Sequence, residues 1–168
     1  KEHYSEAVSA LRKVIAGKKN LTLHLLESVY PAGDEQHLVF GITGKIIPEG
    51  GIPASAGVIV QNACTALNLY YAAANKEPVT KRWLTVCGAV KKPVTINTPV
   101  GTHVSDLLKL AGGARTADFI VLDGGPMMGK IVDAKTYAVK KTTSAILVLP
   151  AGHEFTRRKT EPVKTSIT

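Results

Sequence analysis

A glycine-rich stretch that ends in a lysine, GGPMMGK at residues 124 to 130, is the most suggestive chemical motif in the sequence. It follows an apolar run, and a glycine, four intervening residues and a Gly-Lys pair have the spacing of a phosphate-binding loop. Such a loop also needs Ser or Thr after the lysine to hold Mg²⁺, and a helix that begins there. Here Ile131 follows the lysine, Pro126 removes one amide donor, and the next residues alternate like a strand. The pattern therefore predicts a glycine-rich turn between two strands and no phosphate site.

Two other stretches carry polar side chains suited to a ligand, YPAGDE at residues 30 to 35 and QNACT at residues 61 to 65. Gly33 lets the backbone approach a ligand closely, because it has no Cβ. The amide of Asn62 can both donate and accept hydrogen bonds. Asp34 and Asn62 have a second interpretation as helix N-caps, and the sequence leaves both interpretations open.

Other kinds of active site find little support in the sequence. The five histidines are scattered, and no Ser or Cys has a recognisable base partner, which argues against a hydrolytic enzyme. Cys64 and Cys87 form no C-x-x-C pair, so neither a metal nor an iron-sulfur site is expected within this segment. The net charge of +8 is dispersed, without an aromatic platform or a basic helix, which argues against nucleic-acid binding. No apolar run approaches the roughly 18 to 20 residues of a membrane helix, so we expect a soluble chain without membrane insertion.

Helical and strand-like patterns alternate over the first 78 residues. Helices are expected at residues 4 to 15, 34 to 42 and 61 to 75, and short buried strands at residues 21 to 26 and 57 to 60. Helix, strand, helix, strand, helix is the order of a βαβ-type layer. The fold class predicted for this part is therefore α/β.

From residue 79 the pattern changes to short strands with one helix between them. Strands are expected at 83 to 90, 94 to 98, 119 to 122, 130 to 132, 137 to 140 and 145 to 149. Thr102 is expected to cap the helix, which Gly112 and Gly113 end. This is the order of a small β-grasp unit, so we expect a domain boundary near residues 78 to 80. The basic tail, residues 151 to 168, is expected to be a solvated terminus or a docking surface for an acidic partner.

Three parts of the chain together resemble a known family. They are YPAGDEQ at 30 to 36, GGIPASAGVIVQNACTAL at 50 to 67, and the series RWLTVCGAVKKP, GTHVSDLLKLAGG, DGGPMMGK and KKTTSAILVLP between 82 and 150. In this order and spacing they resemble the RnfC-type electron-transfer subunits, relatives of the flavoprotein subunit of respiratory NADH dehydrogenase. The resemblance implies half of a Rossmann-like FMN- and NADH-binding domain at residues 1 to 78 and a soluble-ligand-binding β-grasp domain at 79 to 150. The end of the chain resembles the soluble branch more closely, the cobalamin reductases and proline-reductase-associated proteins, and the branch is left open.

The resemblance also implies cofactor contacts, although it assigns no catalytic residue and no metal ligand. The residues at the cofactor and nicotinamide would be Tyr30, Gly33, Asp34 and Glu35, and those that hydrogen-bond the flavin side would be Gln61, Asn62 and Thr65. Thr65 lies in the first turn of an expected helix, whose amino end favours a phosphate. Gln61 stands where the family commonly has Asn, and Cys64 stands where it commonly has Glu or Gly.

The function implied by the resemblance is electron transfer from NADH through FMN to iron-sulfur clusters and an acceptor. Partners would be other subunits of a complex or a soluble redox acceptor, in the cytoplasm or peripheral at the inner face of the cell membrane. The family's glycine-rich flavin loop lies upstream of the match, and its cysteine motifs for iron-sulfur clusters lie downstream. We therefore expect a fragment of a longer protein, with an incomplete flavin site that does not hold flavin tightly and no activity of its own.

One alternative function remains open at this point. The β-grasp half would then be a ligand-binding or partner-binding scaffold module without redox activity. The turn with Met127 and Met128 supports this alternative, since adaptable methionine side chains suit a contact surface.

Overall fold

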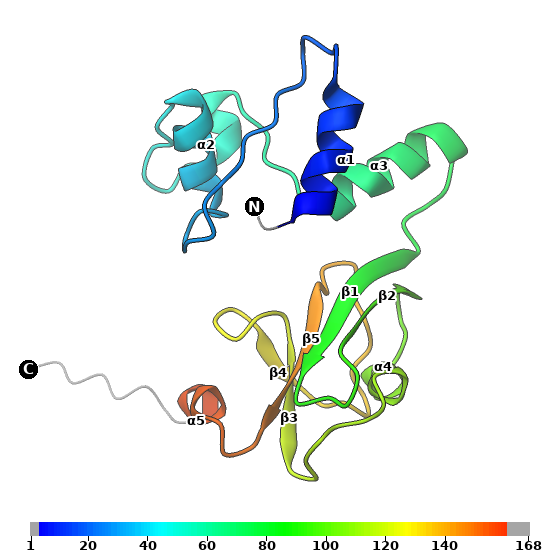
Figure 1. The fold of residues 1–168 in the computed structure, drawn as a ribbon. Coiled ribbons are helices and arrows are strands. Elements are labelled where there is room, and N and C mark those ends of the chain that lie inside the picture. The colour runs from blue at the N-terminus through cyan, green and yellow to red at the C-terminus, as the bar shows by residue number, and fades with distance from the viewer. Residues whose placement is uncertain (1–3, 161–168) are drawn as a thin grey trace, which may run out of the picture. The chain divides into compact units, whose positions relative to one another are not determined.

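The computed structural model describes residues 4 to 160, and the chain divides into two compact units, Lys1–Asn62 and Ala63–Thr168 (Figure 1). The division falls between Asn62 and Ala63, whereas the sequence predicts a domain boundary near residues 78 to 80. The difference is one helix, which the structure groups with the second unit. The division into a domain at residues 1 to 78 and a domain at residues 79 to 150 stays a prediction.

The first unit contains two α-helices and a short 3₁₀ helix: α1 (Ser5–Ile15), α2 (Glu35–Thr43) and η1 (Pro53–Ala56). Both α-helices lie where their patterns predict them. In α1, Glu6 lies in the first turn and two basic residues lie in the last turn, which complements the helix dipole. Helix α2 begins after Asp34 and ends at Gly44, whose φ of 70° is a conformation that glycine adopts readily.

The two strands predicted in the first unit, at residues 21 to 26 and 57 to 60, do not form. A β-strand requires a hydrogen-bonded neighbour, and neither segment has one among residues 4 to 62. Val39 and Ile47 are the two buried apolar side chains described in this unit, while Ile59 is 80% exposed. The apolar pattern therefore identified segments suited to a sheet, but no sheet forms around them within the described part of the unit.

The second unit is built around a five-stranded mixed sheet (Figure 1). Its order is β2-β1-β5-β3-β4, in which β1 and β5 are parallel and the other neighbours are antiparallel. This arrangement is a β-grasp fold, as the sequence predicted. The elements in chain order are α3 (Ala63–Asn75), β1 (Lys81–Gly88), β2 (Val94–Pro99), α4 (Val104–Leu110), β3 (Phe119–Asp123), β4 (Lys130–Val132), β5 (Ala145–Pro150) and α5 (Glu154–Thr160).

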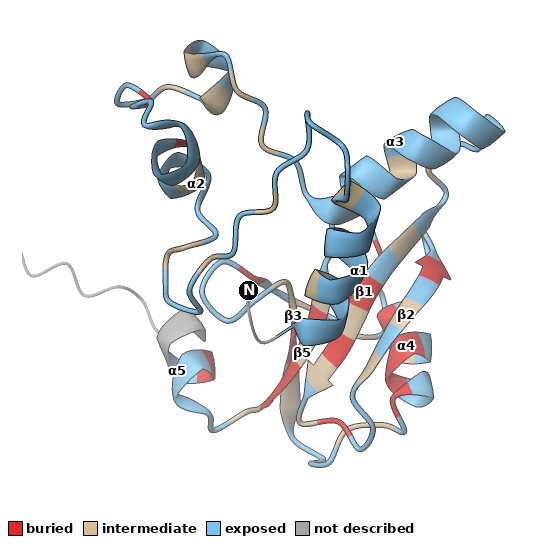
Figure 2. Cartoon of the chain, turned by 45° about the horizontal axis from the view of Figure 1, so that its top comes forward, coloured by how far each residue is buried: buried red, intermediate tan, exposed pale blue. Residues whose placement is uncertain are grey.

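The core of this unit lies between the sheet and α4, where the buried residues gather in Figure 2. Alternate residues of β1, Leu84 and Val86, are buried there, because successive side chains of a strand point to opposite faces. From α4, Val104 and Leu107 are fully buried against them. One face of the β1–β2 hairpin is consequently core, and the other carries Trp83 and its neighbours.

Two smaller predictions for this unit were wrong. The N-cap of α4 is His103, because the hydroxyl of Thr102 donates to the Pro99 carbonyl (2.8 Å) in the turn that ends β2. Residues 137 to 140 form only an isolated bridge between Ala138 and His103, since no strand runs beside them for longer. Part of the predicted tail is the helix α5, where Thr156 is buried and its hydroxyl donates to Pro150 O (3.1 Å). The remainder of the tail, residues 161 to 168, lies outside the described residues.

Candidate functional site

The first predicted cofactor segment forms a tight turn in front of α2. Residues 28 to 34 line a shallow hollow of about 350 Å³, and the Tyr30-Pro31 peptide bond is cis. The backbone N–H of Asp34 donates to Pro31 O (2.7 Å), which closes the turn. Tyr30 is 83% exposed, and a Cβ added at Gly33 would meet no atom within 4 Å. The side chain of Tyr30 and the backbone at Gly33 are thus both open to a ligand within this unit.

Asp34 is the N-cap of α2. Its Oδ1 accepts hydrogen bonds from the backbone N–H groups of Gln36 (3.0 Å) and His37 (3.3 Å) and lies 3.2 Å from His37 Nδ1. The hydrogen bond with the His37 side chain is the main cause that lowers the pKa of Asp34. The capping interpretation that the sequence left open is therefore realised, and any contact of Asp34 with a ligand would use its remaining oxygen.

The residues just before the second predicted segment lie beside the first at the amino end of α2. Glu35 lines a hollow of about 240 Å³ together with residues 52 to 54 and 58 to 60. Gln61 and Asn62 follow this segment directly and are exposed. Thr65 is also exposed, but it lies in the first turn of α3 and belongs to the second unit. Of the seven predicted residues, the structure therefore brings Glu35 beside the segment that leads into Gln61 and Asn62.

The chemistry of these residues suits a flavin, while the space they enclose does not hold one by itself. Amide side chains and an accessible backbone supply the donors and acceptors that an isoalloxazine edge needs. The hollow beside Glu35, about 240 Å³ in volume, lies below the roughly 300 to 1,000 Å³ of ligand pockets, and the shallow hollow at residues 28 to 34, about 350 Å³, lies near the lower end of that range. The residues present thus fit one wall of a flavin site.

A polar cluster that the sequence analysis missed lies at the end of β3. The hydroxyl of Tyr137 donates to Asp123 Oδ2 (2.6 Å), and the hydroxyl of Thr143 donates to the same oxygen (3.1 Å). Burial, followed by the hydrogen bond to Asp123, raises the pKa of Tyr137 to about 12. Lys140 Nζ lies 4.9 Å from the centre of the Tyr137 ring, at a distance suited to a cation–π contact. The cluster fixes the chain after β4 to the end of β3, and its members are too far apart in the sequence to form a recognisable motif.

The glycine-rich turn joins β3 to β4, as predicted. The chain folds so tightly at this turn that a Cβ added at Gly129 would lie 2.4 Å from the backbone oxygen of Gly125. Met127 and Met128 are 65% and 90% exposed at its tip. No helix begins there, so the amide arrangement of a phosphate-binding loop is not formed.

Residues 4 to 160 contain neither a metal-ligand cluster nor a membrane-spanning helix. Among them, no three or more His, Cys, Asp or Glu side chains are grouped as metal ligands would be. None of the helices described there is long and apolar enough to cross a membrane.

Comparison with known proteins finds two domain families along the chain. Residues 1 to 71 match the Nuo51 FMN-binding domain, and residues 84 to 130 match the SLBB domain. The cobalamin reductases PduS of Citrobacter freundii and Salmonella typhimurium are each 41% identical over 165 residues, which is 98% of this chain and 36% of theirs. A subunit of the Na(+)-translocating ferredoxin:NAD(+) oxidoreductase complex of Acetobacterium woodii is 36% identical over 149 residues, 88% of this chain and 34% of that protein. The chain thus spans about a third of the length of these relatives.

The chain thus combines a segment similar to an FMN-binding domain with an SLBB domain of β-grasp order. Both kinds of relative align with nearly the whole length of this chain. The chain matches a fragment of the RnfC-type family, as its sequence motifs predicted.

Proposed function

We propose that this chain is the flavin-contacting and SLBB part of an electron-transfer subunit. In that subunit, NADH would deliver a hydride to FMN, and electrons would pass one at a time to iron-sulfur clusters and an acceptor. The observation that carries the proposal is the match of residues 1 to 71 to an FMN-binding domain, and the position of Glu35 beside residues 58 to 60 in the first unit supports it. FMN suits this role because a flavin accepts a hydride and can release single electrons.

Within this proposal, residues 1 to 78 are part of a Rossmann-like domain. The segments 21 to 26 and 57 to 60 would be two of its strands, and their partners are not among the residues that the structure describes in this unit. Their apolar composition and the 80% exposure of Ile59 support the proposal, since an unpaired strand that belongs in a sheet leaves apolar surface open. Residues 79 to 150 would be the second domain.

The residues proposed to contact the cofactor and nicotinamide have distinct roles. Gly33 would let the backbone approach the ring, Asn62 would donate to and accept from its polar edge, and Thr65 would bind the phosphate at the amino end of α3. The other proposed contacts are Tyr30, Asp34, Glu35 and Gln61.

The proposed partners follow from the same family. The Acetobacterium woodii relative is named as part of a ferredoxin:NAD(+) oxidoreductase complex, and PduS is named as a cobalamin reductase. We propose that this chain likewise works with other subunits of a complex or with a soluble redox acceptor, in the cytoplasm or at the inner face of the cell membrane.

A flavin titration of the purified chain tests the proposal. We expect weak but saturable quenching of FMN fluorescence, because only one wall of the site is present. Asn62→Ala should weaken binding about fivefold or more, the effect of losing about 1 kcal/mol or more of hydrogen bonding. The matched control is Asn20→Ala, an exposed asparagine of the same unit outside the proposed site, which should leave the affinity unchanged.

Two results would contradict the proposal. One is a chain that purifies with a full complement of tightly bound flavin, which would contradict the incomplete site. The other is that the chain does not bind FMN, or that neither Asn62→Ala nor Asn20→Ala changes its affinity for FMN. Either outcome would contradict a flavin-binding role for this segment.

A second candidate function is a scaffold module in which the β-grasp unit docks a partner without redox activity. The exposure of Met127 and Met128 at the tip of the glycine-rich turn favours it. Replacing both methionines with serine should then abolish capture of the partner complex and leave FMN binding unchanged.

A further inference from the structure

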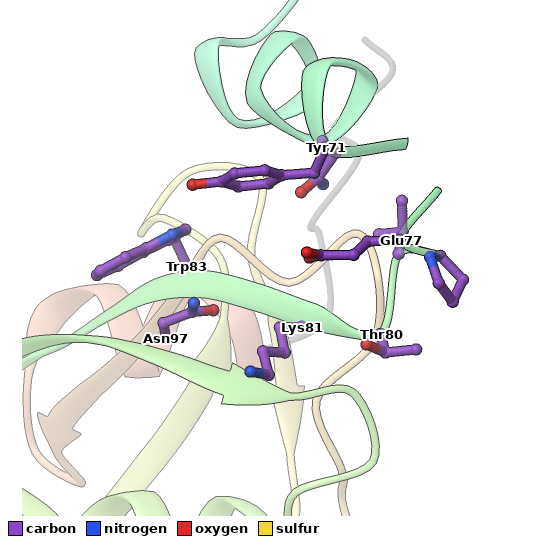
Figure 3. A pocket seen from close by; sticks show the side chains of 9 residues that line it. Tyr71, Glu77, Thr80, Lys81, Trp83 and Asn97 are labelled. Atoms are coloured by element: carbon purple, nitrogen blue, oxygen red, sulfur yellow. The ribbon is translucent and has the colours of Figure 1, made fainter. Parts of the chain in front are cut away.

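A hollow of about 400 Å³ lies within the second unit, between α3 and the outer face of the β1–β2 hairpin (Figure 3). Its volume falls in the lower part of the roughly 300 to 1,000 Å³ range of small-molecule pockets. None of the proposed flavin contacts lines it. The residues around it are Asn68, Tyr71, Glu77, Pro78, Val79, Thr80, Lys81, Trp83 and Asn97.

The strand side of the hollow is set by the register of the hairpin. Leu84 is buried in the core, so its neighbour Trp83 points to the opposite face of the sheet. Trp83 and Asn97 are directly paired across β1 and β2 and therefore share that face. This places an indole ring beside an amide that can both donate and accept hydrogen bonds.

The helix side of the hollow is formed by Tyr71 of α3. Figure 3 shows its ring on the wall opposite Trp83, with open space between the two side chains. Tyr71 is 39% exposed and Trp83 is 45% exposed, so the two rings keep accessible surface. Aromatic walls on two sides of a small hollow favour a planar ring, which gains dispersion and quadrupole interactions by stacking.

The other end of the hollow carries one acid and one base. Figure 3 shows Glu77 and Lys81 on the same side, away from Trp83. Glu77 Oε1 also accepts a hydrogen bond from Asn75 Nδ2 (3.1 Å), which orients its carboxylate. A phosphate placed there would be attracted by Lys81 and repelled by Glu77. Hydroxyl groups, in contrast, can donate a hydrogen bond to the Glu77 carboxylate and accept one from the Lys81 ammonium group.

We propose that this hollow binds a small uncharged heteroaromatic compound with a hydroxylated end, of the size and chemistry of a purine nucleoside. The ring would stack between Tyr71 and Trp83, with its polar edge at Asn97. The hydroxyl groups would face Glu77 and Lys81. This site is separate from the proposed flavin contacts and does not depend on them.

Titration of the full 168-residue chain with adenosine tests the proposal. Trp83 is the only tryptophan, so its fluorescence reports directly on the hollow. We expect a saturable change in that fluorescence, and an affinity that Tyr71→Ala weakens about tenfold, the effect of removing one stacking partner from a base. Tyr71→Phe keeps the aromatic face and should retain the affinity.

The matched control is Tyr70→Ala, which removes a 62% exposed tyrosine from the same helix outside the hollow and should leave the affinity unchanged. Asn97→Ala, at an exposed position of β2, provides a second variant that spares α3 and should also weaken binding. Ribose, which lacks the ring, should give no response, and AMP should bind no more tightly than adenosine, because Lys81 attracts its phosphate and Glu77 repels it.

Three outcomes would overturn the proposal. They are no saturable response to adenosine, equal affinities in the Tyr71→Ala and Tyr70→Ala variants, or tighter binding of AMP than of adenosine. Asn62→Ala should leave adenosine binding unchanged, so failure of this proposal and failure of the flavin proposal are distinguishable.

Discussion

Gly88, at the end of β1, offers a sharp test of the sheet register. It has a φ of 89° and pairs with Val148 of the parallel strand β5. A Cβ at this position would lie 2.1 Å from the backbone oxygen of Val148 and 2.8 Å from a methyl carbon of Leu147. The same oxygen accepts a hydrogen bond from the N–H of Ala89 (2.8 Å), so the two strands cannot separate there without weakening this bond.

Gly88→Ala should therefore lower the free energy of unfolding through two additive effects. The left-handed backbone costs an L-residue about 1 to 2 kcal/mol. Moving Val148 away from β1 weakens one backbone hydrogen bond, which adds about 0.5 to 1.5 kcal/mol. We expect a total loss of about 1.5 to 3.5 kcal/mol, a substantial part of the stability of a small domain.

Gly101→Ala is the matched control, because Gly101 has a similar φ of 97° but an added Cβ would meet no atom within 4 Å. It should cost only the backbone contribution, about 1 to 2 kcal/mol. Urea unfolding followed by Trp83 fluorescence measures both variants in the unit that contains the sheet. Equal losses for the two variants would refute the close approach of β1 and β5, and with it the register on which the position of Trp83 depends.

Two further predictions concern the same unit. Tyr137→Phe should lower the free energy of unfolding at neutral pH by about 1 kcal/mol, through loss of the hydrogen bond to Asp123. Because the pKa of Tyr137 is raised from 10.0 to about 12 in the fold, wild-type stability should be complete below pH 10 and fall as the pH rises to about 12. The phenylalanine variant should lack this decline in pH-dependent urea unfolding, and an identical decline in both proteins would contradict the assignment. Leu107→Ala, at a fully buried position, should cost about 2 to 5 kcal/mol by calorimetry, whereas Leu110→Ala on the 65% exposed side of α4 should change stability by no more than about 0.5 kcal/mol.

The features that the sequence predicted correctly depend on interactions between residues close together in the chain. Helix α2 runs from its cap at Asp34 to Gly44, and its capping hydrogen bonds join residues two and three positions apart. The turn at 124 to 129 was recognisable because glycines and a proline restrict the local backbone. The β-grasp order of the second unit also followed from local patterns, since each strand and the helix α4 carry their own apolar periodicity.

Only the tertiary structure decided which of these segments pair. The apolar segments at 21 to 26 and 57 to 60 fit strands, but a strand needs a partner, and periodicity says nothing about whether one is present. The bond from Tyr137 to Asp123 and the hollow between Tyr71 and Trp83 likewise join side chains from separate elements. The sequence by itself determined the helices, the glycine-rich turn and the resemblance to the RnfC-type family. Long-range packing sets the register of β1 on β2 and β5. That register determined which side chains face one another, and therefore which sites can form.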